Sequence, residues 1–127
     1  MITKKDKIFV AGSTGMVGRS IYELLQKKNF RLINSVKRID FKNKNKVNVF
    51  IKKNKPTIII IAAAVVGGIY ENNKFPVKFL RDNLEIQNNL INLAFQNGIK
   101  KIIFLGSSCV YPKKNSLINE SDLLSGS

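Results

Sequence analysis

Apolar residues along this chain occur either in short continuous runs or at spacings of three and four positions. Continuous runs predict buried strands, and the wider spacing predicts amphipathic helices. The clearest strand is at residues 57–62, where consecutive isoleucines are typical of a strand that is buried on both faces. Similar runs predict further strands at residues 7–11, 30–35 and 101–105.

Helices are predicted in the intervals between these strands. Residues 16–28 and 77–97 repeat apolar side chains at helical spacing, and the second of these segments ends at Asn97 and Gly98, a common C-terminal stop. Residues 47–54 predict a third, shorter helix. The apolar positions that define the two longer helices are Val17, Ile21, Leu24 and Leu25 in the first and Leu80, Leu84, Ile91 and Ala94 in the second.

The remaining internal segments predict loops. Residues 37–46 are polar, and residues 63–76 contain a glycine pair and Pro76. Strands that alternate with helices in the order β-α-β-α-β-α-β imply a parallel sheet with right-handed crossovers. We therefore predict one α/β domain over residues 1–127, of the Rossmann type, with about four strands in the order 3-2-1-4.

The chain is strongly basic. It has 22 lysines and arginines against 8 acidic residues, which gives a formal net charge of +14. Such an excess suits nucleic acid or another anionic partner. The basic residues are nearly all lysines, they occur in every segment, and no nucleic-acid reader motif accompanies them. We therefore expect no specific nucleic-acid partner, and an anionic small molecule fits the charge equally well.

The composition also excludes several kinds of chemistry. The chain has no histidine and one cysteine, so it holds neither a Ser-His-Asp nor a Cys-His arrangement, and no zinc site is expected. One cysteine makes no internal disulfide. No apolar run approaches the ~20 residues that span a bilayer, and the amino terminus lacks the pattern of a secretory signal. These features predict a cytoplasmic protein with no membrane association.

Three glycines form a GxxGxxG pattern directly after the first predicted strand and at the start of the first predicted helix. In this context the spacing allows a tight turn, close approach of the backbone to a pyrophosphate, and close packing of the helix on the strand. Backbone N–H groups and the helix dipole then hold the phosphate charge. The alternative is a glycine-rich turn that binds nothing. The pattern predicts cofactor contacts from Gly12, Ser13, Thr14, Gly15, Met16, Val17 and Gly18.

The end of the second predicted strand indicates which dinucleotide binds. An acidic residue there binds the ribose 2′-hydroxyl of NAD, whereas a basic residue accommodates the 2′-phosphate of NADP. The chain has Lys37 and Arg38 at this place and no acid before Asp40. We therefore predict NADP(H), with Arg38 as the first candidate for the phosphate and Lys37 as the second, and with Asp40 at the adenine. The alternative is that both cations belong to a solvated, lysine-rich surface.

The segment LGSSCVYP, residues 105–112, follows the fourth predicted strand and contains the only cysteine. Taken alone, a single cysteine at a strand end is often a small buried hydrophobe. Adjacent serines often cap a turn. The other interpretation is that this segment forms one wall of an active site beside the cofactor, and the neighbouring motifs favour it.

Three stretches, GSTGMVG, AAAVVGGI and LGSSCVYP, together resemble the extended short-chain dehydrogenase/reductase family. The second and third, with Asn72, Asn73 and the Phe75-Pro76 pair, are similar to the GDP-L-fucose synthases within that family. The resemblance covers essentially the whole chain. It implies an NADPH-dependent epimerase-reductase that converts GDP-4-keto-6-deoxymannose to GDP-L-fucose, with a GDP-sugar as partner and a homodimer as the assembled form. The alternatives are another NAD(P)-dependent nucleotide-sugar epimerase or dehydratase, and a non-catalytic dinucleotide-binding module.

The resemblance also implies roles for single residues. Ser107 would hydrogen-bond the reacting sugar oxygen, and Cys109 would move protons at carbons 3 and 5 of the sugar ring. A thiol suits this role because protons beside a ketone are acidified, so that a modest base removes them. The further cofactor contacts that the resemblance implies are Ala63 and, on the nicotinamide side, Leu105, Gly106 and Ser108.

The spacing YxxxK of the family's catalytic Tyr-Lys pair occurs at Tyr70 and Lys74, but these residues precede the fourth predicted strand and lie in the wrong place for that pair. Tyr111, which follows that strand, has Asn115 at the position of the lysine. The resemblance therefore predicts a truncated amino-terminal NADP-binding domain, without the substrate domain and inactive alone. It also predicts an unpaired apolar edge at the strand of residues 101–105, which would favour self-association.

Overall fold

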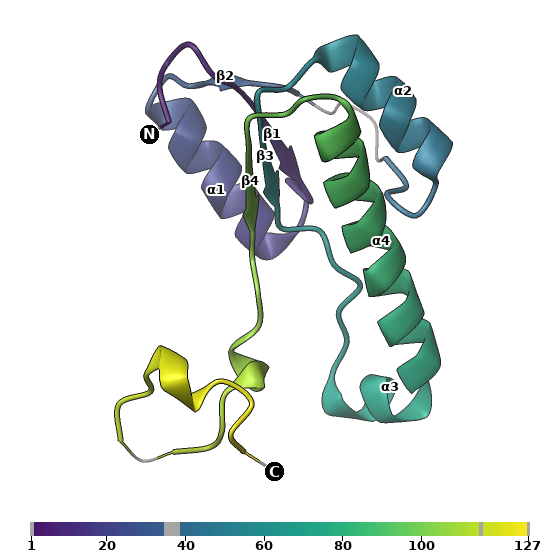
Figure 1. The fold of residues 1–127 in the computed structure, drawn as a ribbon, viewed down its shortest axis with the longest axis vertical. Coiled ribbons are helices and arrows are strands. Elements are labelled where there is room, and N and C mark those ends of the chain that lie inside the picture. Colours follow the sequence, from purple (N-terminus) through teal and green to yellow (C-terminus); the bar gives the residue numbers. More distant parts are fainter. Residues whose placement is uncertain (1, 35–38, 115, 127) are drawn as a thin grey trace.

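The computed structural model describes residues 2–34, 39–114 and 116–126, which form a parallel sheet of four strands with helices on both faces (Figure 1). The predicted class, an α/β sheet of the Rossmann type, is confirmed. In chain order the elements are β1 (Lys7–Ala11), α1 (Met16–Lys27), β2 (Arg31–Leu32), α2 (Lys44–Asn54), β3 (Ile58–Ile61), α3 (Ile69–Lys74), α4 (Pro76–Gln96), β4 (Lys101–Phe104) and the 3₁₀ helices η1 (Ser108–Val110) and η2 (Glu120–Asp122).

The strand order across the sheet is β2-β1-β3-β4, so the predicted order 3-2-1-4 is wrong. The third strand lies on the other side of β1 from β2, between β1 and β4. Burial explains this position, because the isoleucines of β3 are at most 5% exposed and need a neighbouring strand on each side. The two-residue β2, with its exposed Arg31, forms an edge instead.

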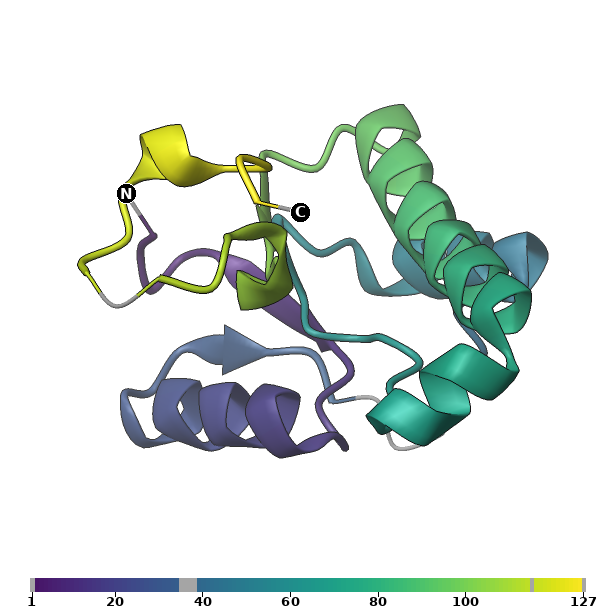
Figure 2. The ribbon, with the colours of Figure 1, turned by 90° about the horizontal axis from the view of Figure 1, so that it is seen from below.

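The side chains of β1 and β3 supply two separate cores. On one face of the sheet, Phe9 and Ile59 pack with side chains of α2 and α4. On the opposite face, Ile8 and Ile60 pack with side chains of α1. Successive strand residues point to opposite faces, so an uninterrupted apolar run fills both cores at once. Figure 2 shows α1 and α4 on opposite sides of the sheet.

The segment of residues 63–76, predicted as a loop, contains the helix α3. The glycine pair precedes this helix and does not interrupt it, since Gly68 is its N-cap residue. Pro76 begins α4, at a position where its missing N–H costs no helical hydrogen bond. Glycine and proline mark helix boundaries as well as loops, which is why the pattern alone misassigned this segment.

Two further elements differ from their predicted bounds. In the described part of the strand predicted at residues 30–35, only Arg31 and Leu32 are strand residues, although the backbone N of Ile33 also donates to the Ile8 carbonyl oxygen (2.8 Å). α2 begins at Lys44, earlier than predicted, because Asn43 Oδ1 accepts a hydrogen bond from the backbone N of Lys46 (3.0 Å) and caps the helix. The other predicted helices and strands agree with the structure to within about two residues.

α4 extends past the sheet toward α3 (Figure 1). Its carboxyl-terminal half packs on the sheet through Ile86, Leu90, Leu93 and Ala94. The predicted helix is confirmed, but Leu80 and Leu84 in its amino-terminal half are 64% and 44% exposed. The buried residue of that half is Asp82. None of the described helices, α4 included, is both long and apolar enough to cross a membrane.

Ile59 is fully buried between two neighbouring strands, so its replacement measures how much the core depends on β3. We expect Ile59→Ala to lower the free energy of unfolding by about 2–5 kcal/mol, because it leaves a cavity in the core. Val49→Ala, at a position of α2 that is 66% exposed, should lower it by less than about 0.5 kcal/mol. Urea unfolding followed by circular dichroism measures both values, and equal losses would contradict the central position of β3.

Candidate functional site

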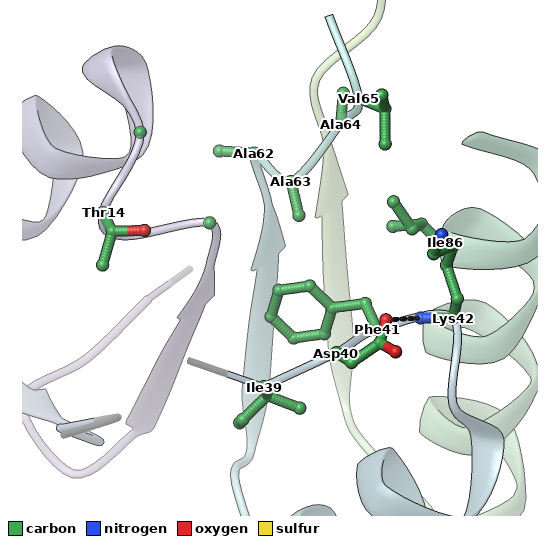
Figure 3. A pocket seen from close by; sticks show the side chains of 12 residues that line it. Thr14, Ile39, Asp40, Phe41, Lys42, Ala62, Ala63, Ala64, Val65 and Ile86 are labelled. Carbon is green, nitrogen blue, oxygen red and sulfur yellow. Dashed lines mark hydrogen bonds between the residues drawn. The ribbon is translucent and has the colours of Figure 1, made fainter. Parts of the chain in front are cut away.

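The loops that follow β1 and β3 meet at the carboxyl edge of the sheet, because these strands are parallel neighbours. Between them and the segment that precedes α2 lies a cavity of about 450 Å³ (Figure 3). Its lining residues are Gly12, Thr14, Gly15, Ile39, Asp40, Phe41, Lys42, Ala62, Ala63, Ala64, Val65 and Ile86. The cavity therefore opens where open α/β sheets bind their ligands.

Two of the three glycines in the GxxGxxG loop are required by the packing of the chain itself. Gly12 has a φ of +90°, and a Cβ on it would lie 2.7 Å from the backbone N of Ala63. A Cβ on Gly18 would lie 2.6 Å from the carbonyl carbon of Gly12 and would also overlap its oxygen. The absence of these side chains lets the end of β1, the loop after β3 and the first turns of α1 approach one another closely.

Gly15 is different, because no close contact among the described residues requires glycine at this position. The nearest atom to a Cβ on Gly15 would be the carbonyl oxygen of Gly12, at 3.4 Å, and Gly15 lines the cavity. It is also the N-cap residue of α1, which has no side-chain cap and no acidic residue in its first turn. The first N–H groups of α1 and the positive end of its dipole therefore lie at the cavity wall, which suits a phosphate.

A second wall of the cavity is formed by residues 39–42. Asp40 lines the cavity, and its Oδ1 accepts a hydrogen bond from the backbone N of Lys42 (3.1 Å). Lys37 and Arg38, the candidates for a 2′-phosphate, lie outside the described residues. Their role in choosing the cofactor therefore stays a prediction.

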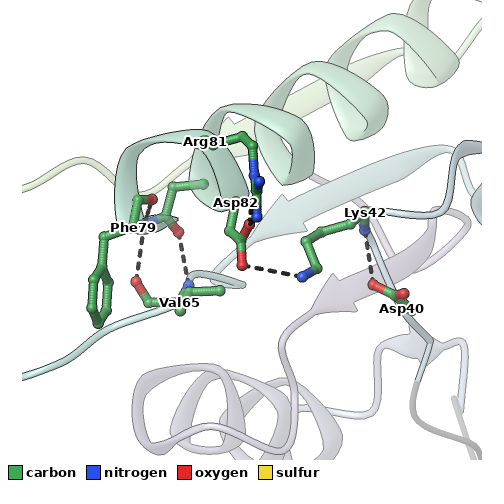
Figure 4. A network of polar contacts seen from close by, with 7 residues as sticks. Asp40, Lys42, Val65, Phe79, Arg81 and Asp82 are labelled. Atoms are coloured by element: carbon green, nitrogen blue, oxygen red, sulfur yellow. Dashed lines mark hydrogen bonds and ion pairs between the residues drawn. The ribbon is translucent and has the colours of Figure 1, made fainter. Parts of the chain in front are cut away.

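A buried carboxylate stands beside this second wall (Figure 4). Asp82 of α4 is 2% exposed, and its Oδ2 lies 3.1 Å from Nζ of Lys42. Its Oδ1 lies 3.1 Å from a guanidinium nitrogen of Arg81. The hydrogen bond from Lys42 is the main cause that holds the pKa of Asp82 below its ordinary value; burial opposes this effect, and Arg81 adds to it.

The segment after β4 lies outside the cavity. Ser107 Oγ accepts a hydrogen bond from the backbone N of Cys109 (3.2 Å), so this serine caps η1. Cys109 is exposed, which means that the interpretation of this residue as a small buried hydrophobe is wrong. Its thiol is accessible to a molecule that approaches this edge of the sheet.

The structure brings together only part of the residues predicted from the sequence. The predicted residues that line the cavity are Gly12, Thr14, Gly15, Asp40 and Ala63. Those that do not line it are Ser13, Met16, Val17, Gly18, Leu105, Gly106, Ser107, Ser108 and Cys109. Gly18 packs behind the glycine loop, whereas Met16 is 86% exposed. The glycine loop and the loop after β3 therefore line one cavity, and the segment after β4 does not line it.

Several residues that line the cavity were not predicted from the sequence: Ile39, Phe41, Lys42, Ala62, Ala64, Val65 and Ile86. One signal could have identified the alanines and Val65, since they directly follow a buried parallel strand that neighbours β1. Lys42 and Ile86 reach the cavity through packing between segments that are distant in the sequence. No local pattern encodes that packing.

The fold and the cavity are those of a Rossmann-type nucleotide-binding domain, and comparison with known proteins specifies the family. The chain belongs to the NAD-dependent epimerase/dehydratase family, whose model matches residues 8–127. It is 44% identical over 130 residues to GDP-L-fucose synthase 1 of Arabidopsis thaliana, an alignment that covers 100% of this chain and 40% of that protein. The expected similarity to the GDP-L-fucose synthases is thereby confirmed. The chain spans about 40% of the length of this relative.

Solved structures of nucleotide-sugar enzymes are also similar to this chain. The GDP-mannoheptose C4 reductase from Campylobacter jejuni with NADP bound superposes with a TM-score of 0.86 at 35% identity, covering 99% of this chain and 41% of that one. A GDP-L-fucose synthetase from Naegleria fowleri bound to NADP gives a TM-score of 0.81 at 32% identity, covering 99% of this chain and 42% of that one.

Gly18 provides a direct test of the backbone packing at the glycine loop. We expect Gly18→Ala to lower the free energy of unfolding by about 1–3 kcal/mol, because its methyl group would overlap the Gly12 carbonyl. Gly106→Ala is the matched control, since a Cβ there meets no atom of the described residues within 4 Å, and it should change the free energy of unfolding by less than about 0.5 kcal/mol. Denaturant titration of both variants measures the difference, and a neutral Gly18→Ala would contradict the described geometry.

Proposed function

We propose that this chain is the NADP(H)-binding part of a nucleotide-sugar epimerase-reductase of the GDP-L-fucose synthase type. The observation that carries the proposal is the glycine loop. Gly12 and Gly18 serve the packing of the chain, whereas Gly15 lacks such a contact and lines a cavity at the start of α1. An open glycine at a helix start suits a pyrophosphate. The two relatives whose structures contain NADP support the choice of cofactor.

In this proposal different residues of the chain bind different parts of the cofactor. The glycine loop and the N-terminus of α1 hold the pyrophosphate. Asp40 lies at the adenine, and Arg38, or Lys37 in its place, pairs with the 2′-phosphate. Ala63 contacts the cofactor at the end of β3. On the nicotinamide side the proposed contacts are Leu105, Gly106 and Ser108.

The chemistry proposed for the segment after β4 is proton transfer to and from a GDP-sugar. Ser107 donates a hydrogen bond to the reacting sugar oxygen and positions the ring. The Cys109 thiolate removes a proton from carbon 3 or 5, beside the ketone, and becomes a thiol. Inversion then requires a second acid of the whole enzyme, which would deliver a proton to the opposite face of the ring. NADPH, when bound, would supply the hydride that reduces the 4-keto group.

We further propose that this chain alone binds the cofactor without catalysing the full reaction. Its YxxxK spacing, from Tyr70 to Lys74, lies in α3 and not after β4, where the resemblance places the catalytic pair. General acid–base groups of this kind typically contribute about 10²–10⁴-fold to a rate. The whole enzyme would then be a cytoplasmic homodimer that acts on a GDP-sugar.

Cofactor binding is measurable on the 127-residue chain. We expect NADPH at about 100 times its Kd to raise the free energy of unfolding by about 2.7 kcal/mol, with a smaller effect of NADH at the same concentration. Gly15→Asp should abolish the effect of NADPH while leaving the ligand-free melting temperature close to that of the parent, because its Cβ would make only an ordinary contact with the Gly12 carbonyl oxygen and its carboxylate repels the phosphates. Thermal melts followed by circular dichroism test both points. A folded chain that NADPH does not stabilise would contradict the proposed function.

Arg38 tests the choice between the two cofactors. We expect Arg38→Ala to weaken NADPH binding by about tenfold and to leave NADH binding unchanged, because only NADPH carries the 2′-phosphate. Lys37→Ala should have a smaller effect. Isothermal titration calorimetry of the parent chain and both variants, with each nucleotide, gives the six dissociation constants. An unchanged preference in Arg38→Ala would show that the 2′-phosphate binds elsewhere.

Cys109 is best tested in an enzyme that joins this chain to the carboxyl-terminal part of a relative such as the Arabidopsis synthase. We expect Cys109→Ser to slow deuterium exchange from solvent into carbons 3 and 5 of the sugar by about 10²–10⁴-fold. NADPH binding should stay the same. Mass spectrometry of the recovered sugar measures the exchange, and full exchange in the variant would remove Cys109 from the proposed chemistry.

A further inference from the structure

Three polar side chains of α4 hold the two loops that form walls of the cavity. Asp82 and Asn89 contact the segment of residues 39–42, and Asn83 contacts the loop after β3. Figure 4 shows Asp82 and its neighbours between the two walls. α4 therefore does more at this edge of the sheet than pack against the core.

Asn83 fixes the loop after β3. Its Oδ1 accepts a hydrogen bond from the backbone N of Val65 (2.7 Å), and its Nδ2 donates to the Val65 carbonyl oxygen (2.9 Å). One side-chain amide therefore satisfies both backbone groups of Val65, beyond the end of the sheet. Val65 lines the cavity, so this contact sets the position of that wall.

The segment of residues 39–42 is held both by its backbone and by a side chain. Asn89 Nδ2 donates to the carbonyl oxygens of Phe41 (3.0 Å) and Lys42 (2.8 Å). Lys42 Nζ lies 3.1 Å from the buried Oδ2 of Asp82 and points toward α4 in Figure 4. The backbone N of Lys42 donates to Asp40 (3.1 Å). A continuous series of contacts therefore runs from α4 through Lys42 to Asp40 at the cavity.

Lys42 and Asp82 are buried to different extents. The side chain of Asp82 is 4% exposed, whereas that of Lys42 is 39% exposed. A buried carboxylate that loses a cationic partner is strongly unfavourable, so Asp82 holds Lys42 in one place and does not merely attract it. Arg81 also pairs with Asp82, but its side chain is 63% exposed and does not line the cavity.

We propose that Asp82 is a positioning residue for the cofactor site, acting through Lys42 to hold the 39–42 wall in the geometry that accepts the adenosine end of the dinucleotide. The proposal rests on the proposed cofactor-binding function and assigns to the Lys42–Asp82 pair a part in affinity that is separate from its part in stability. The Lys42 ammonium group donates to Asp82, and the proposal assigns this lysine to the position of the wall and not to a direct contact with phosphate.

The experiment compares three charge-removing variants by isothermal titration with NADPH and with adenosine 2′,5′-bisphosphate, which carries only the adenosine end. We expect Lys42→Met and Asp82→Asn each to raise both Kd values by about tenfold, the size expected for loss of one charge-assisted hydrogen bond. The double variant should bind no more weakly than the weaker single variant, because the two residues act as one unit. Lys42→Arg keeps the pair and should stay within about threefold of the parent chain.

Arg81→Met is the matched control. It removes the other cation from the same carboxylate, so it should lower the melting temperature while leaving both Kd values within about twofold, since Arg81 lies off the cavity. Lys42 lies on the surface, so Lys42→Met tests the proposal even in the event that Asp82→Asn does not fold. Circular dichroism establishes that each titrated variant is folded.

The outcomes separate the two proposals. If the parent chain is folded and binds neither nucleotide, the proposed function fails and this inference fails with it. If the parent chain binds and Lys42→Met binds as tightly, only the positioning role of Asp82 is overturned. If Lys42→Met and Arg81→Met weaken binding equally, the pair acts through stability alone and the inference is likewise overturned.

Discussion

The close approach of three backbone segments at the carboxyl edge of the sheet is the constraint on which the rest of the structure depends. At Gly12 and Gly18, the end of β1, the loop after β3 and the first turns of α1 come so near that not even a methyl group fits. This approach requires β1 and β3 to be direct neighbours, which they are from Ile8 and Ile58 onward. It also directs the start of α1 at the cavity, so one steric condition determines both the packing of a helix and the place where an anion is favoured.

Much of the fold and the first wall of the site follow from local sequence patterns. Consecutive isoleucines predict the strand β3 whatever its position in the sheet. The glycine spacing predicts the loop after β1, because the geometry of this loop depends on a few adjacent residues. The position of β3 beside β1 was not predictable in this way, because alternating strands and helices are compatible with more than one strand order. Gly68 and Pro76 were ambiguous for a related reason, since both types of residue stand at helix boundaries and in loops.

The second wall depends on contacts between residues that are far apart in the sequence. The many lysines of the chain made the lysine of this wall impossible to identify from the sequence. Lys42 and Asp82 are separated by 40 positions, and among 22 basic residues nothing distinguishes Lys42 from its neighbours. In such a chain the acidic residues are better guides to specific ion pairs than the basic residues are. There are only 8 of them, and a carboxylate that is buried has to select its cation by geometry.

The spacing of polar residues on α4 also restricts which insertions and deletions this helix can tolerate during evolution. Asp82 and Asn89 both reach the 39–42 segment because they are separated by about two helical turns and share one face. Inserting or deleting one residue between them would rotate one relative to the other by about 100° and shift it by about 1.5 Å along the axis. The exposed side chains of α4 are free to diversify, whereas the number of residues between these two positions is not.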